Sequence, residues 1–166
     1  GNLLASIGSQ SPDGNTPTYQ ALLAAYGVMG AHASQGGRHV LLITDGDPDA
    51  RTSEAPKAFE PECGWWQDIW DAATQARQAS PSVGTYVIGS PGVTKFEFLS
   101  RLAVEGGTRR SPTCDEGAGC GTAGSCCHHQ IGTVDFEADL ASVLTELRGQ
   151  IAGCTFSLPT GAEVDP

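Results

Sequence analysis

The amino-acid sequence predicts an α/β fold in which mostly parallel strands are joined by helices. Two apolar runs rich in β-branched residues, Val40–Thr44 and Val83–Gly89, have the length and composition of buried strands. Segments with helical periodicity precede, separate and follow these runs, and this alternation is typical of a parallel sheet with right-handed crossovers. The 166 residues are enough for one domain with its own core.

The first predicted helix opens at Thr16-Pro17, where Thr is a favourable N-cap and Pro fits the first helical position. The segment from Gly30 to Gly37 ends this helix, and the strand Val40–Thr44 follows. Four side chains that recur at helical spacing are expected to face the core: Leu22, Leu23, Tyr26 and Met29.

Three further helices are predicted, at Trp65–Ala79, Lys95–Glu105 and Asp135–Gln150, and Asp135 is the expected cap of the last one. Gln130–Thr133 is predicted as a short strand, and Cys154–Leu158 as either one more strand or an extended tail. The side chains expected to face inward are Trp66, Ile69, Trp70 and Ala73 in the first of these helices, Phe96, Leu99, Leu102 and Ala103 in the second, and Phe136, Leu140, Val143, Leu144 and Leu147 in the third.

Composition restricts the classes of partner. The formal net charge of −10 repels nucleic-acid phosphates and anionic membrane surfaces, whereas it suits cations or simply a well-solvated surface. No apolar run approaches the roughly 18 residues of a membrane span.

Six cysteines are many for a cytosolic domain of this size, so they predict disulfides and an oxidising, exported location. Because no signal peptide is visible, we expect a processed or truncated piece of a longer protein.

Asp45 is the first candidate functional residue. It ends the strand within HVLLITDGDP, the segment from His39 to Pro48. Ligands of open α/β sheets bind beyond the carboxyl ends of strands, so a carboxylate at this position is well placed for chemistry or for a metal ion. The alternative is a turn residue that caps the next element.

A second oxygen donor, Thr16, lies upstream in the segment DGNTPT. It stands at a predicted helix start about one crossover before Asp45. A hydroxyl at a helix start and a carboxylate at a strand end can meet at the same edge of a sheet. Oxygen ligands of this kind suit a hard cation such as Mg²⁺.

The order and spacing of these motifs resemble a von Willebrand factor type A (VWA) domain, from about Asn2 to Ile151. The matching stretches are GNTPTYQAL, LLITDGDP, TYVIGSPG and FLSRLAVEGGT, and the pairing of the first two is the specific part. The Cys-rich loop and the CTFSLP tail look like exported bacterial members of the family. The resemblance implies a three-layer, doubly wound (Rossmann-like), mostly parallel sheet with flanking helices.

The resemblance also implies a metal-ion-dependent adhesion site (MIDAS). Thr16 matches the family's Thr that coordinates the ion directly, and Asp45 matches the Asp that holds it, often through water. The ion, which is Mg²⁺, Mn²⁺ or Ca²⁺, keeps an open coordination position. An acidic side chain of a protein partner fills that position, and this is how such domains bind.

The chain departs from the family at the first metal loop, a D-x-S-x-S motif after the first strand. Ser9-Gln10-Ser11 offers the S-x-S half, but Ile7 stands at the position of the Asp. The first strand, the first helix and two more strands of the family are absent, so we expect weak ion binding or none by this chain alone. The absent first strand would lie beside Val40–Thr44 and is expected from the missing N-terminal segment or from another chain, because a bare apolar edge promotes aggregation.

Four cysteines and two histidines fall between Cys114 and His129, which makes a zinc site one alternative. Their spacing, C-x₅-C-x₅-C-C-H-H, lacks the usual zinc-binding pairs, so disulfides are expected, with His128 and His129 as loop residues. In a parallel sheet this loop and Cys154 are expected at the amino edge, and Cys63 at the carboxyl edge. The expected pairs are Cys154 with Cys126 or Cys127, and Cys114 with Cys120.

We therefore expect residues 1–153 to form the C-terminal portion of a VWA-like domain, with residues 106–129 as a Cys-rich insertion and 154–166 as a tail or linker. The expected function is a protein-binding or adhesion module of an extracellular, cell-surface or periplasmic protein. The alternative is a disulfide-stapled structural block of a larger surface assembly with a vestigial metal site. An enzyme is not expected, because no nucleophile or base accompanies Asp45.

Overall fold

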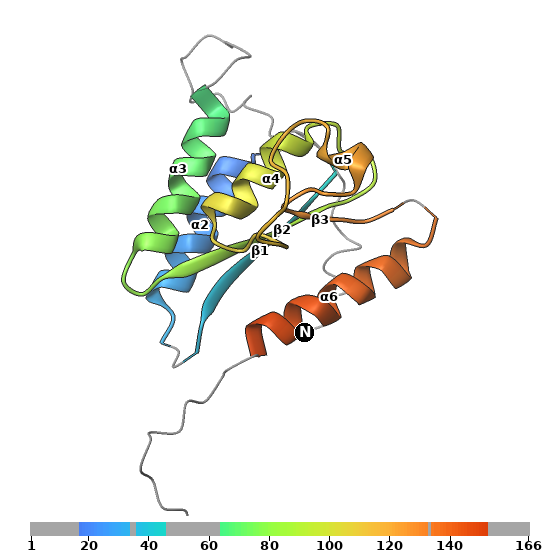
Figure 1. The fold of residues 1–166 in the computed structure, drawn as a ribbon. Coiled ribbons are helices and arrows are strands. Elements are labelled where there is room, and N and C mark those ends of the chain that lie inside the picture. Colours follow the sequence, from blue (N-terminus) through green and yellow to red (C-terminus); the bar gives the residue numbers. More distant parts are fainter. Residues whose placement is uncertain (1–16, 34–35, 46–63, 133, 153–166) are drawn as a thin grey trace, which may run out of the picture. The chain divides into compact units, whose positions relative to one another are not determined.

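The computed structural model describes residues 17–33, 36–45, 64–132 and 134–152 of the chain. The chain divides into two units, Gly1–Gln130 and Ile131–Pro166, and each is described by itself. The elements of the first unit are the helices α2 (Thr18–Ala31), α3 (Gly64–Gln78), α4 (Phe96–Glu105) and α5 (Cys120–Ala123) and the strands β1 (Arg38–Thr44), β2 (Val83–Gly89) and β3 (His129–Gln130) (Figure 1).

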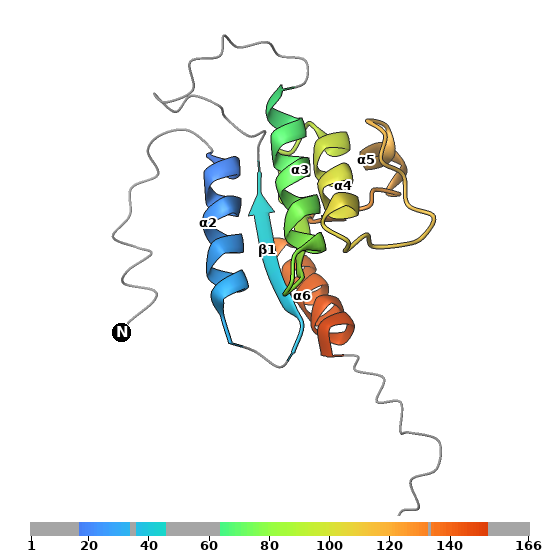
Figure 2. The ribbon, with the colours of Figure 1, turned by 90° about the vertical axis from the view of Figure 1, so that its left-hand side faces the viewer.

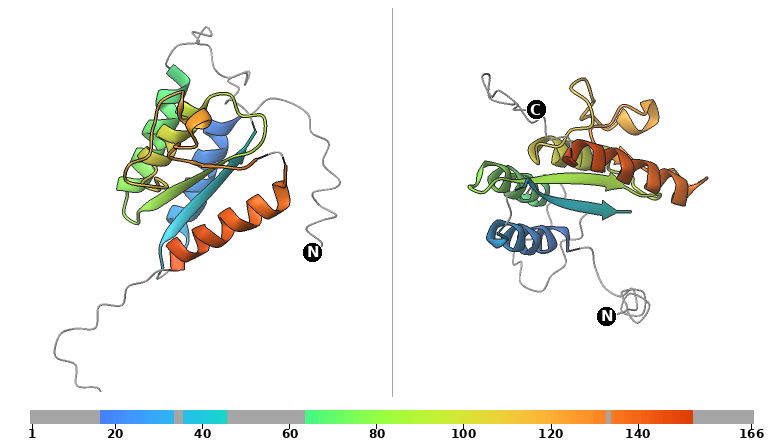
Figure 3. Two further views of the ribbon diagram at one scale, coloured as in Figure 1. Left: turned by 45° about the vertical axis from the view of Figure 1, so that its right-hand side comes forward. Right: turned by 90° about the horizontal axis from the view of Figure 1, so that it is seen from below.

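The three strands form a parallel sheet in the order β1-β2-β3. β1 and β2 pair along their whole length, from Arg38↔Val83 to Thr44↔Gly89, and Figure 3 shows their arrows pointing the same way. The predicted α/β alternation and parallel pairing are confirmed. β2 has the predicted bounds, whereas β1 begins two residues before Val40.

Helices α2, α3 and α4 lie side by side along one face of this sheet (Figure 2). Alternate residues of β2 point toward them, and the Tyr26 hydroxyl of α2 lies 2.8 Å from the Thr85 hydroxyl. Leu23 does not face the core as predicted; it is 44% exposed, because it lies about 100° around the helix from the buried Leu22. The core is formed by Leu22, Tyr26, Val40, Ile69, Ala73, Val83, Val87, Phe98, Leu99 and Leu102.

Aromatic side chains join α3 to α4. The helical periodicity of α3 predicts that Trp66 and Trp70 face inward. Trp66 and Trp70 are half-buried, and their ring centroids lie 5.3 and 6.1 Å from that of Phe98, a core residue that the sequence did not identify. The Trp70 indole donates to the Phe98 carbonyl at 3.2 Å, and the Arg101 guanidinium lies 4.7 Å above the Trp70 ring. This cluster fixes α4, whose first turns carry part of the site described below.

One face of β1 departs from the prediction of a fully buried strand. Leu41 and Ile43 are 42% and 46% exposed, whereas Val40 and Thr44 on the other face are buried. A run of apolar residues shows that a strand is buried on at least one face but does not specify what covers the second one. Within the described part of the chain, β1 pairs with β2 only.

The second unit contains the helix α6 (Phe136–Ala152). The Asp135 carboxylate accepts the Ala138 amide at 3.2 Å, which confirms its predicted role as the cap. Leu147 is buried as expected, but Phe136 and Leu144 are 45% and 40% exposed, so their predicted burial is wrong. Cys154–Leu158 lies outside the described residues. None of the described helices combines the length and the apolar character that crossing a membrane requires.

Candidate functional site at the carboxyl edge of the sheet

The carboxyl ends of the three parallel strands meet at one edge, which we call the carboxyl edge. It contains Thr44-Asp45 at the end of β1, Gly89–Gly92 at the end of β2 and Gln130 at the end of β3. The Ser90 amide donates to the Thr44 carbonyl at 2.8 Å and ties the end of β2 to the end of β1. Sites of open α/β proteins form at this edge, because loops and helix starts converge there.

Asp45 lies at this edge and is exposed, at the position that the sequence predicts. Gly92 approaches it closely: its φ is +112°, and a Cβ added there would lie 3.2 Å from the Asp45 carbonyl oxygen. Both the positive φ and the close approach favour glycine at position 92. The loop after β2 therefore packs directly against the backbone of the candidate ligand.

Thr16 lies outside the described residues, so its predicted meeting with Asp45 stays a prediction. In the described ranges, no three His, Cys, Asp or Glu side chains converge in a way that could hold a metal ion. Asp45 supplies one exposed carboxylate, which fits a hard cation as a single ligand of an oxygen-donor set. Further ligands have to come from other parts of the chain or from other molecules.

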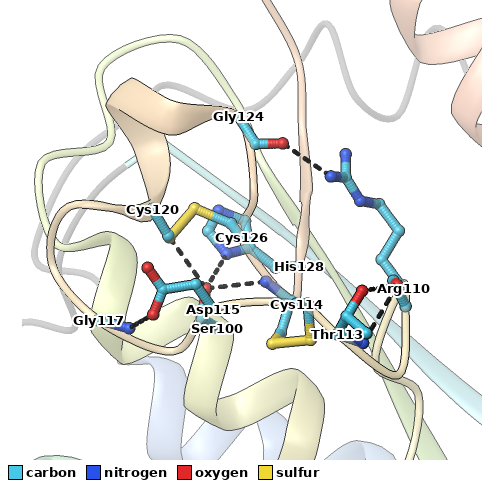
Figure 4. The surroundings of a disulfide bond; sticks show 12 residues. Ser100, Arg110, Thr113, Cys114, Asp115, Gly117, Cys120, Gly124, Cys126 and His128 are labelled. Atoms are coloured by element: carbon cyan, nitrogen blue, oxygen red, sulfur yellow. Dashed lines mark hydrogen bonds between the residues drawn. A yellow bond between two sulfur atoms is a disulfide. The ribbon is translucent and has the colours of Figure 1, made fainter.

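The Cys-rich loop contains two disulfides, Cys114–Cys127 and Cys120–Cys126, with Cα–Cα distances of 4.9 and 4.7 Å (Figure 4). Disulfide bonding in this loop is confirmed, but the predicted pairs Cys114–Cys120 and Cys154 with Cys126 or Cys127 are wrong. Asp115 forms a parallel bridge with Cys126, so the segment around Cys114 lies alongside the segment that carries Cys126 and Cys127. Cys63 and Cys154 lie outside the described residues.

The predicted position of this loop at the amino edge is also only half right. The loop begins in that part of the sheet, where the Thr85 amide donates to the Gly106 carbonyl at 3.1 Å. It ends at the carboxyl edge, because the two residues of β3 pair with Ile88 and Gly89, the last residues of β2. The disulfide-linked residues that precede β3 consequently lie near the candidate site.

A series of polar side chains, buried at Ser100 and His128 and part-buried at Gln130, connects the Cys-rich loop to the carboxyl edge. The His128 ring is fully buried; its Nδ1 lies 3.0 Å from the Ser100 Oγ of α4, and its Nε2 lies 3.0 Å from the Gln130 Oε1. The Ser100 Oγ accepts the Cys127 amide at 3.2 Å, and the Gln130 side chain donates to the Ser90 carbonyl at 3.5 Å. Figure 4 shows dashed lines that join Ser100 to His128 and to Cys120, one cysteine of the Cys120–Cys126 bond.

Burial lowers the pKa of the His128 imidazole to about 4. The Gln130 hydrogen bond raises this pKa, whereas the charges of His129 and Arg110 lower it further. His128 is therefore neutral at physiological pH, so one ring nitrogen donates a hydrogen bond through its N–H and the other accepts a hydrogen bond.

Sequence reasoning did not find this chain, because it treated His128 and His129 as loop residues, and both are buried. Two signals were available. Ser100 follows Leu99 on the buried side of a predicted helix, and a buried hydroxyl requires a partner. His128 and Gln130 are two residues apart at a strand entry and so project to the same face. Ser100 lies 28 residues before His128 in the sequence, and Gln130 lies 2 residues after it. Only the fold shows that these side chains are partners.

Comparison of the chain with protein-family models, with curated proteins and with solved structures gave no match. The functional proposal therefore depends on the residues and geometry described above.

Proposed function

We propose that the chain is a protein-binding or adhesion module of the VWA type, belonging to an exported or cell-surface protein, and that it binds its partner at the carboxyl edge. The observation that supports this most directly is the exposed carboxylate of Asp45 at the end of a parallel strand. Gly92 packs against the backbone carbonyl of Asp45, and the Ser90–Thr44 hydrogen bond fixes the neighbouring strand ends.

In this proposal Thr16 and Asp45 are the ligands that the chain contributes to a Mg²⁺, Mn²⁺ or Ca²⁺ ion. The ion, when bound, links the module to a carboxylate of the partner. The net charge of −10 gives the ion a second role, because the negative field of the protein repels an acidic partner unless a cation lies between them. Since the D-x-S-x-S loop is not present in the chain, binding by the chain alone is weak.

An exported location is supported by the two disulfides, since such bonds persist in oxidising compartments. They staple a loop that ends at the proposed binding edge, so they hold the surface that a partner would meet. The doubly wound arrangement with helices on both faces of the sheet belongs to the same proposal.

A second candidate function is a structural building block in a larger surface assembly, with a vestigial metal site. The observation that favours it is the outer face of β1, where Leu41 and Ile43 are nearly half exposed, together with the pairing of β1 with β2 only among the described residues. Exposed strand edges are templates for pairing with another segment. In either function, we propose that a further strand, from another part of the protein or from another chain, pairs along β1.

Divalent ions distinguish the two functions. Titration of Mg²⁺, Mn²⁺ and Ca²⁺ into the oxidised protein is expected to raise the melting temperature, because an ion that binds only the folded state stabilises it. At an ion concentration tenfold above Kd the gain is about 1.4 kcal/mol, or roughly 3–6 °C. Asp45→Ala is expected to abolish the shift.

The matched control is Asp68→Ala, which removes an exposed carboxylate of α3 and is expected to keep the shift. No shift in the unsubstituted protein would favour the building-block function. A shift that survives in Asp45→Ala would contradict the role given to that residue.

A further inference from the structure

We propose that His128 is a positioning residue: it transmits the geometry of the disulfide-stapled loop to the carboxyl edge through a series of hydrogen bonds that is buried from Cys127 to His128 and part-buried at Gln130. The chain runs from Cys127 through Ser100, His128 and Gln130 to Ser90. A role of His128 in ion or partner binding rests on the proposed function, whereas its role in positioning the carboxyl edge does not.

The donors and acceptors in this series of hydrogen bonds can be assigned in one consistent way. The Gln130 amide nitrogen faces the Ser90 carbonyl, so its Oε1 faces His128 and accepts a hydrogen bond from Nε2–H. The neutral imidazole then has a lone pair on Nδ1, which accepts a hydrogen bond from the Ser100 hydroxyl. The Ser100 oxygen in turn accepts the Cys127 amide. Every donor in this series has an acceptor only while His128 is neutral and protonated on Nε2.

The loop end of the chain is fixed by covalent bonds and packing. Cys127 is bonded to Cys114, and Cys120, whose sulfur lies 3.4 Å from the Ser100 Oγ, is bonded to Cys126. The His128 ring stacks on Phe96 with an interplanar angle of 15° and a centroid distance of 6.3 Å. The imidazole is thus held on its face and at both nitrogens.

The other end of the chain reaches the backbone beside Asp45. Gln130 donates to the Ser90 carbonyl, and the Ser90 amide donates to the carbonyl of Thr44, the residue before Asp45. Gly89 leaves the space for this junction, since a Cβ at that position would overlap the Gln130 Oε1 and lie 3.2 Å from the His128 Nε2. Loss of His128 or Gln130 therefore loosens Ser90 without removing any atom from the proposed ion ligands.

Amide hydrogen exchange in the full oxidised chain, followed by ¹⁵N NMR, measures this positioning directly. His128→Phe keeps a ring that can stack on Phe96 but removes both nitrogens. We expect exchange of the Ser90 amide to accelerate about fivefold or more relative to that of Val87 in the middle of β2, the factor that one net hydrogen bond represents. The matched control is His39→Phe, which removes a half-buried histidine at the amino end of β1 and is expected to leave this ratio unchanged.

Gln130→Met removes the two links that Gln130 makes, to His128 and to Ser90, but keeps those between His128, Ser100 and Cys127, and it serves if His128→Phe does not fold. It is expected to accelerate Ser90 exchange to a similar degree while the amides of Cys120 and Cys127 keep their protection. An unchanged ratio of Ser90 to Val87 exchange in the folded variants would overturn the positioning role of His128.

A Mn²⁺ titration of the same samples separates this inference from the proposed function. Weaker Mn²⁺ binding in His128→Phe than in His39→Phe, together with faster Ser90 exchange, supports both. Faster Ser90 exchange in a protein that binds no Mn²⁺ supports the positioning role and contradicts the ion site. Unchanged exchange with intact Mn²⁺ binding supports the ion site and overturns the positioning role.

Discussion

Lowering the pH from 7 to 4 is expected to destabilise the folded chain by about 3 kcal/mol through His128 alone. Burial holds the pKa of this imidazole at about 4 in the folded protein, against 6.5 for an exposed histidine. The unfolded chain therefore takes up the proton first as the pH falls. The stabilisation is complete above about pH 6.5 and is progressively lost as the pH falls toward 4.

Urea denaturation at pH 7 and pH 4 measures this loss. His128→Phe is expected to be less stable than the unsubstituted protein at pH 7, because Ser100 and Gln130 lose their partner, but to show a pH dependence smaller by about 3 kcal/mol. His39, whose pKa is also lowered by burial, is present in both proteins, so its contribution cancels in the comparison. Equal pH dependence of the two proteins would contradict the buried neutral state of His128.

Replacing Cys120 and Cys126 together by alanine is expected to lower the free energy of unfolding of the oxidised protein by about 2–3 kcal/mol. The bond closes a short loop, with a sequence separation of 6, and both cysteines are buried. The double substitution also removes the sulfur beside the Ser100 Oγ. Denaturant unfolding under non-reducing conditions gives the free energy.

Peptide mapping accompanies this experiment. The double variant is expected to retain the Cys114–Cys127 bond, and the unsubstituted protein to contain both described bonds. Recovery of a Cys114–Cys120 peptide from the unsubstituted protein, or unchanged stability of the double variant, would show that the loop is stapled differently.

The longer elements of the first unit could be predicted because each has a strong local signal, whereas the four-residue helix α5 was predicted as loop and β3 is His129–Gln130 instead of the predicted Gln130–Thr133. Val83–Gly89 is rich in β-branched and aromatic residues and is bounded by turn residues, so its limits agree with those of β2. The exposure of Leu41 and Ile43 could not be predicted, since an apolar run records burial but not what covers each face. Phe136 and Leu144 show the same limit in α6, where helical phase is correct and the extent of burial is not.

The candidate site could be predicted only where it depends on sequence neighbours. Asp45 follows its strand directly, so the topology of a parallel sheet is enough to place it at the carboxyl edge. The chain through Ser100 and His128 depends on the path of the Cys-rich loop, which the entry point of β3 determines. No local pattern encodes that entry point, and the disulfide pairing was predicted wrongly for the same reason.

Paramagnetic broadening by Mn²⁺ tests the proposed ion site most directly, because it detects weak binding and locates it. In ¹⁵N spectra of the full oxidised chain, sub-stoichiometric Mn²⁺ is expected to broaden the amides of Asp45, Ser90 and Gly92 first, and Asp45→Ala is expected to restore them. Broadening that is confined to other acidic surfaces, such as Asp115-Glu116, or that persists at the carboxyl edge in Asp45→Ala, would contradict a cation site held by Asp45.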